Sequence, residues 1–198
     1  MADHRQTAIT GLVMAGGMSR RMGQDKTQIL IAGVSLTRLA VDKLSNLCER
    51  VVISGRKDDH QDFTEIVIED LVQGLGPMGG LYSVMMACPS DRYLVLAPDI
   101  PLVSVHLLDL LLKQECDGIV VPRGPDGSVE PLVAVYPRTA LPMIREMLES
   151  GNRALHKLIE RYPSCYLDYT AHQIPENTFL NLNSPADLKS FLEVYGEK

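Results

Sequence analysis

Short apolar runs alternate with stretches of helical periodicity along this chain, and that alternation most constrains its fold. The pattern predicts strands at 9–14, 50–53, 66–68, 93–96 and 118–121, with helices at 36–47, 79–88 and 105–115. Strands that alternate with helices indicate a mostly parallel sheet with helices on both faces. The 198 residues suit a single domain, since about 100–200 residues per domain is usual.

The second half of the chain continues with more irregular spacing. It predicts a strand at 131–136, whose direction the pattern leaves open, helices at 140–148 and 155–161, and short strands at 165–168 and 179–181. The run Ser184-Pro-Ala-Asp187 predicts the start of a last helix, with serine as cap, proline in the first turn and an acid three residues on. No linker separates this half, so we expect one domain over residues 1–198.

Polar residues and glycines follow several predicted strands directly. In open parallel sheets, ligands bind at the carboxyl ends of the strands. The residues that should converge there are Gly16, Gly17, Ser54, Asp70 and Asp99. The sequence therefore predicts a ligand site at this edge.

The first strand runs into Gly16-Gly17, and Arg21 and Lys26 follow. Glycines let backbone N–H groups approach an anion closely, and the two cations add fixed positive charge, which together favour phosphate binding. The spacing matches neither a Walker A loop nor the G-x-G-x-x-G dinucleotide pattern. A glycine-rich surface turn with solvated basic residues is the alternative.

Asp99 lies between Pro98 and Pro101, directly after a predicted buried strand. Mg²⁺ prefers oxygen ligands and often binds through one or two carboxylates plus substrate phosphates, which suits an aspartate held there. An aspartate that only caps a turn is the alternative, because aspartate is common in turns.

Composition excludes several classes of function. A net charge of −6 and a pI of about 5.3 argue against a broad nucleic-acid footprint, and no apolar run reaches the roughly 18 residues of a membrane span. The four cysteines form no C-x-x-C pair, and no secretory signal is recognisable. We therefore expect reduced thiols in a cytoplasmic protein that binds neither nucleic acid nor membrane; the cysteines are Cys48, Cys88, Cys116 and Cys165.

The run from Met14 to Lys26, Met-Ala-Gly-Gly-x-x-x-Arg-Met-Gly-x-Asp-Lys, resembles the opening motif of the molybdenum cofactor guanylyltransferases and, more broadly, of the sugar-nucleotide and cofactor nucleotidyltransferases. The glycine-rich segment from Gly74 to Leu81 resembles the family's G-P-L-A-G loop, and Asn181-Leu-Asn183-Ser-Pro resembles the N-x-N-T/S-P run before its last helix. The resemblance extends from about residue 9 to the last helix. It implies a three-layer α/β/α, Rossmann-like nucleotidyltransferase fold of the GT-A-like type.

The resemblance also implies a reaction: transfer of GMP from GTP to the phosphate of the molybdenum-molybdopterin cofactor, with Mg²⁺ as cofactor and pyrophosphate as the second product. The N-terminal half would bind the nucleotide and the C-terminal half the acceptor. The implied catalytic residues are Arg21, Lys26 and Asp99. The implied nucleotide-binding residues are Met14, Ala15, Gly16, Gly17, Lys26, Ser54, Asp70, Gly76, Gly79 and Asp99.

By the same resemblance, Asp99 and Asn183 would hold the metal, and Arg153, Asn181 and Asn183 the acceptor. The chain departs from the family at two places: relatives have asparagine where Ser54 stands, and often a second arginine where Ala154 follows Arg153. Transient contacts with cofactor-inserting proteins and molybdoenzymes are further expectations.

Two other functions remain open. One is a nucleotidyltransferase of the same fold that uses CTP or acts on a sugar phosphate. The paired glycines after Ala15 favour guanine, because the related cytidylyltransferases have Ala-Ala-Gly there. The other is a non-catalytic GTP-binding protein that delivers the cofactor.

Overall fold

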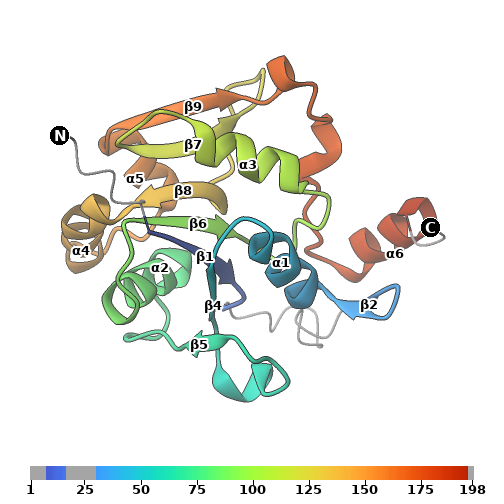
Figure 1. The fold of residues 1–198 in the computed structure, drawn as a ribbon, viewed down its shortest axis with the longest axis horizontal. Helices are drawn as coiled ribbons and strands as arrows, with labels where there is room; N and C mark the ends of the chain where they lie inside the picture. The colour runs from blue at the N-terminus through green and yellow to red at the C-terminus, as the bar shows by residue number, and fades with distance from the viewer. Residues whose placement is uncertain (1–7, 17–29, 196–198) are drawn as a thin grey trace.

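The computed structural model describes residues 8–16 and 30–195, and these form one large sheet covered by helices (Figure 1). The sheet has seven strands in the order β5-β4-β1-β6-β8-β7-β9, and a short hairpin pairs β2 with β3. The strands are β1 Ile9–Met14, β2 Leu30–Ile31, β3 Val34–Ser35, β4 Arg50–Ser54, β5 Ile66–Ile68, β6 Arg92–Leu96, β7 Ile119–Arg123, β8 Val133–Pro137 and β9 Ser164–Asp168. Both halves of the chain therefore contribute strands to the same sheet.

One strand runs against the others. β5, β4, β1 and β6 are parallel neighbours, and β9 is parallel to β7, whereas β8 is antiparallel to both β6 and β7. Leu96, the last residue of β6, lies opposite Val133, the first residue of β8. The start of β8 therefore lies at the same edge as the carboxyl ends of the other strands.

Helices cover both faces of the sheet (Figure 1). α1 and α3 pack on one face, and α2, α4 and α5 on the other. Neighbouring strand residues alternate between the two cores, as Leu12 and Val13 of β1 do, which explains why the strands are apolar throughout. The helices are α1 Leu36–Ser45, α2 Gly76–Ala87, α3 Val105–Lys113, α4 Leu141–Glu149, α5 Leu155–Arg161 and α6 Pro185–Tyr195, with 3₁₀ turns η3 Lys57–His60, η4 Arg138–Ala140, η5 Thr170–His172 and η6 Glu176–Phe179.

Serine caps set the beginnings of α1 and α3. Ser35 Oγ accepts a hydrogen bond from the Arg38 N–H at 3.2 Å, and Ser104 Oγ accepts one from the Leu107 N–H at 3.2 Å. Such a cap satisfies a helix N–H that has no partner within the helix, and its removal typically costs about 1 kcal/mol. The predicted starts of both helices are confirmed.

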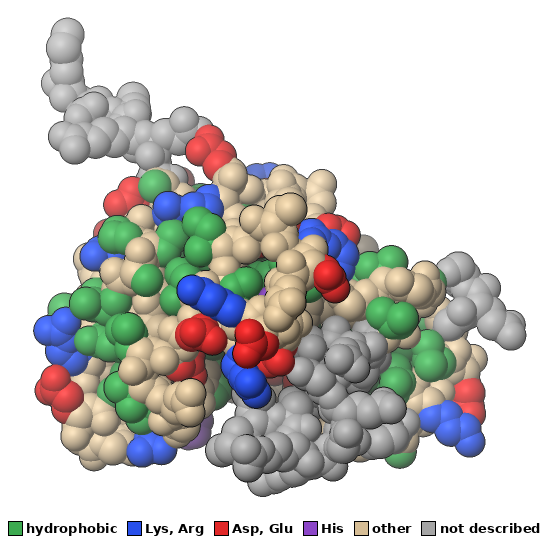
Figure 2. Space-filling model, turned by 90° about the horizontal axis from the view of Figure 1, so that it is seen from below, with side chains coloured by type: hydrophobic (Ala, Val, Ile, Leu, Met, Phe, Trp, Pro, Cys, Tyr) green, Lys and Arg blue, Asp and Glu red, His purple; other side chains and the backbone are tan. Residues whose placement is uncertain are grey.

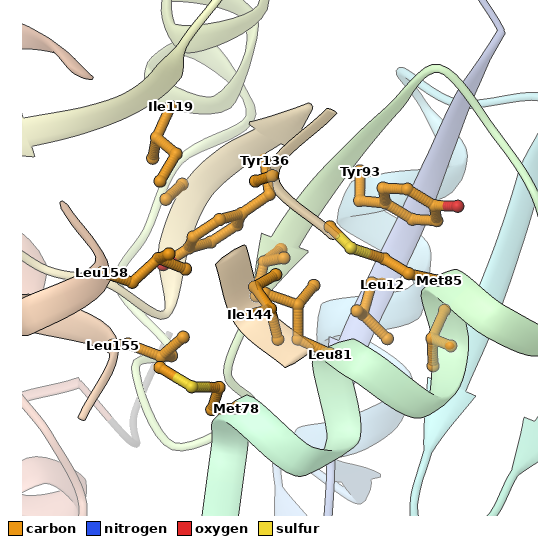
Figure 3. Packing of buried hydrophobic residues seen from close by; sticks show 14 of the residues in the cluster. Leu12, Met78, Leu81, Met85, Tyr93, Ile119, Tyr136, Ile144, Leu155 and Leu158 are labelled. Atoms are coloured by element: carbon orange, nitrogen blue, oxygen red, sulfur yellow. The ribbon is translucent and has the colours of Figure 1, made fainter. Parts of the chain in front are cut away.

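The core under α2 is built from large aliphatic side chains around two buried tyrosines (Figure 3). Met78, Leu81 and Met85 of α2 point toward the sheet. The Tyr136 hydroxyl donates to the Pro131 carbonyl at 2.8 Å, and the Tyr93 hydroxyl donates to the Cys88 carbonyl at 3.0 Å. Both tyrosines thus bury their rings without leaving the hydroxyl unpaired.

Two predicted elements differ from the structure. The helix predicted at 79–88 begins earlier, at Gly76, because Pro77 fits the first turn of a helix, where no N–H is needed. The strand predicted at 179–181 is wrong: η6 ends at Phe179 and irregular chain follows. There the Leu182 N–H donates to the Asp99 carbonyl at 2.8 Å, which replaces strand pairing.

The prediction of four reduced thiols is wrong for one pair. Cys116 and Cys165 form a disulfide, with 6.4 Å between their Cα atoms. The two residues are 49 positions apart, and the parallel pairing of β7 with β9, in which Ile119 lies opposite Ser164, brings them together. Cys48 and Cys88 are buried free thiols, and burial raises the pKa of Cys48 to about 11.

Figure 2 shows the molecule from the β5 end, where acidic and basic side chains are mixed on the surface. Arg38 pairs with Glu65 at 2.9 Å, and Arg56 lies 4.0 Å from Asp58. The exposed Arg56–Asp58 pair contributes at most about 1 kcal/mol, whereas Arg38 and Glu65 are half-buried and joined by two hydrogen bonds. In the described ranges, no helix has the length and apolar character needed to cross a membrane.

Candidate active site

The carboxyl ends of β1, β4 and β5 bring three predicted nucleotide-binding residues together around Gly80. A Cβ atom at Gly80 would lie 2.5 Å from Ser54 Oγ, 2.9 Å from Met14 Cε and 3.4 Å from Asp70 Oδ1. The side chains of Met14, Ser54 and Asp70 therefore surround the place that a side chain at Gly80 would occupy. Only glycine permits this close approach of α2 to the strand ends.

The first turn after β1 packs on the end of β4. Met14 lies opposite Ser54 in the register, and a Cβ atom at Gly16 would lie 3.4 Å from the Ser54 carbonyl oxygen. Ala15, beside it, is half-buried against the core of the α1 face. Gly17, Arg21 and Lys26 lie outside the described residues, so their roles stay predictions.

The loop before α2 is tied to the end of β5. Ser83 Oγ accepts from the Leu71 N–H at 2.9 Å and donates to the Gly79 carbonyl at 2.8 Å, which connects the residue after Asp70 with the first turns of the helix. Gly76 has a φ of +65°, which favours glycine at the start of α2. Burial raises the pKa of Asp70, which is half-buried.

Asp99 follows β6, and the segment before α6 packs on it. Its carbonyl accepts from the N–H of the fully buried Leu182, which lies between Asn181 and Asn183 in the sequence. Asp187 in the first turn of α6 accepts from the N–H groups of Asn183 at 2.9 Å and of Ser184 at 2.8 Å. Residues about 80 positions apart in the sequence thus meet at one edge of the sheet.

The oxygens beside Asp99 fit a hard divalent cation. Asn181 Oδ1 is buried and makes no hydrogen bond to any described residue, and it precedes Leu182, whose N–H donates to the Asp99 carbonyl. Mg²⁺ takes such oxygens and completes its shell with phosphates and water. Within the described residues, no group of three or more histidine, cysteine, aspartate and glutamate side chains could hold a metal.

Lys43 holds the loop that carries Asp99. Its Nζ donates to the Pro101 carbonyl at 2.6 Å, which connects α1 to the turn after β6. Burial lowers the pKa of Lys43 to about 8. The sequence did not point to Lys43, because the helix that carries it was predicted from the spacing of its apolar residues alone.

Glu130 is a second residue that the sequence analysis missed. It precedes β8, and its Oε1 accepts from the Leu132 N–H at 3.2 Å, while the Leu132 carbonyl accepts from the Ala97 N–H at 2.9 Å. Burial raises the pKa of Glu130, the Leu132 N–H lowers it, and the negative charge of Asp99 raises it further. The antiparallel direction of β8 places this carboxyl group at the ligand edge.

Arg153 lies against the glycine-rich loop. Its guanidinium donates to the Gly74 carbonyl at 2.8 Å, so the loop before α5 meets the loop before α2. Arg153 therefore contacts the loop that is predicted to bind the nucleotide, although the resemblance implied that it binds the acceptor. The acceptor role stays a prediction.

Comparison with known proteins identifies the family. Residues 11–165, more than three quarters of the chain, match the model of the MobA-like NTP transferase domain. This chain belongs to the MobA-like NTP transferase family. The resemblance inferred from the run after β1 is therefore confirmed, and the chain is a nucleotidyltransferase.

Curated relatives match over nearly their whole length. A probable molybdenum cofactor guanylyltransferase of Pyrococcus furiosus is 31% identical over 91% of this chain and 95% of its own. One of Pelotomaculum thermopropionicum is 30% identical, over 90% and 89% of the two chains. The molybdenum cofactor guanylyltransferase of Vibrio vulnificus is 26% identical, over 93% and 95%.

Solved structures confirm the fold. Molybdopterin-guanine dinucleotide biosynthesis protein A of Archaeoglobus fulgidus has a TM-score of 0.79 at 24% identity and covers 96% of this chain and 100% of its own. The 2-C-methyl-D-erythritol 4-phosphate cytidylyltransferase of Thermus thermophilus has a TM-score of 0.69 at 15% identity, over 92% and 96%. Since a cytidylyltransferase shares the fold, the fold alone does not fix the nucleotide.

Proposed function

We propose that this member of the MobA-like family transfers GMP from GTP to the phosphate of the molybdenum-molybdopterin cofactor, releasing pyrophosphate. The observation that carries the proposal is the convergence of Ser54, Asp70 and Asp99 with the glycine-rich loop at one edge of the sheet. Relatives named for this activity, about 30% identical over nine tenths of the chain, support it.

The nucleotide would bind across the ends of β1, β4 and β5. The backbone N–H groups of Gly16 and Gly17, with Arg21 and Lys26, would face the triphosphate. Gly76 leaves open space for a flat base near the start of α2, whereas at Gly79 the Leu75 side chain fills the place of a Cβ atom. The Asp70 carboxylate can accept hydrogen bonds from the N–H groups of guanine.

Asp99 would hold the magnesium ion, and Asn181 Oδ1 or the predicted ligand Asn183 could complete the protein's share of its shell. A bound Mg²⁺ would offset the negative charge on the phosphates. Lys43, through the Pro101 carbonyl, would keep the Asp99 loop in place.

In the transfer, an oxygen of the acceptor phosphate bonds to the α-phosphorus of GTP as the bond from that phosphorus to pyrophosphate breaks. No bond to the protein forms. The protein contributes position and positive charge where negative charge develops on the phosphoryl oxygens.

We propose that the N-terminal half of a single domain binds GTP and the C-terminal half the acceptor. The reaction would take place in the cytoplasm, where GTP is available. Transient contacts with cofactor-inserting proteins and molybdoenzymes would deliver the acceptor and remove the product.

The test is pyrophosphate release from GTP, CTP, ATP and UTP, each with Mg²⁺ and the molybdopterin cofactor. We expect turnover with GTP, and a fall on the order of 10²–10³ in kcat for Asp99→Asn with the fold unchanged. Asp62→Asn, an exposed aspartate that is not among the proposed site residues, is the matched control. A preference for CTP would overturn the substrate, and GTP binding without pyrophosphate release would indicate a delivery protein.

A further inference from the structure

A cavity of about 230 Å³ lies beyond the nucleotide-binding strands, between the ends of β7 and β9 and the start of β8. It is lined by Pro122, Ser128, Val129, Glu130, Tyr169, Glu176 and Phe179. Pockets for drug-sized ligands usually measure about 300–1,000 Å³, so this cavity suits a ring system and not a whole dinucleotide.

Hydrogen bonds hold the turn between β7 and β8, which supplies Ser128 to the wall of the cavity. Asp126 Oδ1 accepts from the N–H of Ser128 at 3.0 Å and from its hydroxyl at 2.6 Å, and the Gly124 N–H donates to the Ser128 carbonyl at 2.8 Å. A Cβ atom at Gly124 would lie 3.0 Å from the Tyr169 hydroxyl oxygen, so this turn packs on the aromatic wall.

The lining combines aromatic rings with carboxyl groups. Tyr169 and Phe179 pack with ring centroids 4.9 Å apart, and Glu130 and Glu176 supply the carboxyl groups. The residues that line it include no lysine or arginine, as far as the structure describes the chain. Such a cavity suits a flat ring that carries N–H donors and does not suit a phosphate or another anion.

The position of the cavity connects it to the proposed reaction. Glu130 is close enough to Asp99 for the two charges to interact, and Phe179 is two residues before Asn181 in the segment that packs on Asp99. A group bound in the cavity therefore lies beside the predicted metal site, on the side away from Ser54 and Asp70.

We propose that this cavity binds the pterin ring of the acceptor, and that Glu130 determines specificity by accepting hydrogen bonds from the ring's 2-amino group and N3–H. The inference rests on the proposed function, which names the acceptor. These two donors point the same way along one edge of the ring, a geometry that matches the two oxygens of a carboxylate. Glu130 keeps acceptor capacity for them, because a carboxylate offers about four lone-pair sites and Leu132 occupies one.

The experiment uses the full-length protein and two fluorescent probes, pterin and lumazine, which carries an oxo group in place of the 2-amino group. We expect the wild type to bind pterin roughly 10–100-fold more tightly than lumazine, because lumazine lacks a donor to a charged acceptor. Glu130→Gln should lower pterin affinity at least about tenfold and remove the preference over lumazine. Phe179→Leu, which keeps an apolar side chain without the ring, should weaken both probes.

Glu49→Gln, an exposed glutamate outside the cavity, is the matched control and should bind both probes like the wild type. In the pyrophosphate assay, Glu130→Gln should raise the KM for the molybdopterin cofactor more than it changes kcat. Equal binding of the two probes, or an unchanged pterin affinity in Glu130→Gln, would overturn the inference even if GTP and the cofactor still release pyrophosphate. Glu130-dependent pterin binding without pyrophosphate release would support the cavity and contradict the proposed function.

Discussion

At the scale of single residues, the site contains a buried polar group that has no hydrogen-bond partner among the described residues. Ser54 Oγ is buried and makes no hydrogen bond to any described residue, although buried hydroxyl groups are normally paired. Ser83, on the neighbouring helix, has a buried hydroxyl with two partners. The nucleotide-binding role proposed for Ser54 would account for this contrast, whereas Ser83 connects parts of the fold.

Ser54→Ala should therefore leave the free energy of unfolding unchanged or slightly higher, because no hydrogen bond within the described structure is lost. GTP affinity should fall about 2–12-fold, the value of one neutral hydrogen bond. Denaturant titration and calorimetry measure the two quantities. Ser83→Ala is the control and should lose about 1–3 kcal/mol of stability. A Ser54→Ala protein as unstable as Ser83→Ala, with GTP affinity intact, would make Ser54 a structural residue.

At the scale of elements, the loop after β6 depends on partners from distant parts of the chain. α1 holds it through Lys43, and the segment before α6 holds it through Leu182. Loops are usually the mobile part of a fold, so these two contacts explain how Asp99 is kept at a fixed place.

The half-buried Lys43 should give stability a measurable pH dependence. Between its folded pKa of about 8 and the ordinary value of 10.5, the unfolded chain binds a proton that the folded chain has released. The free energy of unfolding should therefore rise with pH in this window, by up to about 3 kcal/mol from this residue.

Lys43→Met should lack that rise, while Lys189→Met, at an exposed position on α6, should keep it. Urea titrations at several pH values from neutral to about 10.5 measure the difference, since the remaining groups titrate alike in all three proteins. The same slope in Lys43→Met and the wild type would contradict the low pKa.

At the scale of the whole molecule, one sheet joins the two halves of the chain, and its far end carries the disulfide. β7 and β9 are neighbours in space although α4 and α5 separate them in sequence. The bond between Cys116 and Cys165 therefore closes a long loop around the β8, α4 and α5 region. Such a link stabilises a protein chiefly by restricting its unfolded chain.

Cys165→Ser should lower the free energy of unfolding by about 2–4 kcal/mol under non-reducing conditions, and a reductant should abolish the difference from the wild type. Denaturant titrations with and without reductant measure this effect. Thiol titration of the unfolded, unreduced wild type should find only Cys48 and Cys88. Four reactive thiols in the unreduced wild type would contradict the bond. So would a wild type that is equally stable with and without reductant.

The sequence alone determined the features that depend on neighbouring residues. The β1 strand, the Ser35 and Ser104 caps, and the aspartates that follow β5 and β6 each arise from a few adjacent side chains and backbone groups. Parallel strands bring their carboxyl ends to one edge whatever lies between them, so a site there could be predicted before the structure was known.

The tertiary structure alone decided what depends on pairing over long distances. The direction of β8 follows from its partners β6 and β7, and only that direction moves Glu130 to the ligand edge. The disulfide, the contact of Lys43 with Pro101 and the irregular path after Phe179 likewise need a partner 49 or more residues away. Local patterns cannot determine such contacts. The spacing of apolar residues along an element shows which of its faces is buried, but not which distant segment will cover that face.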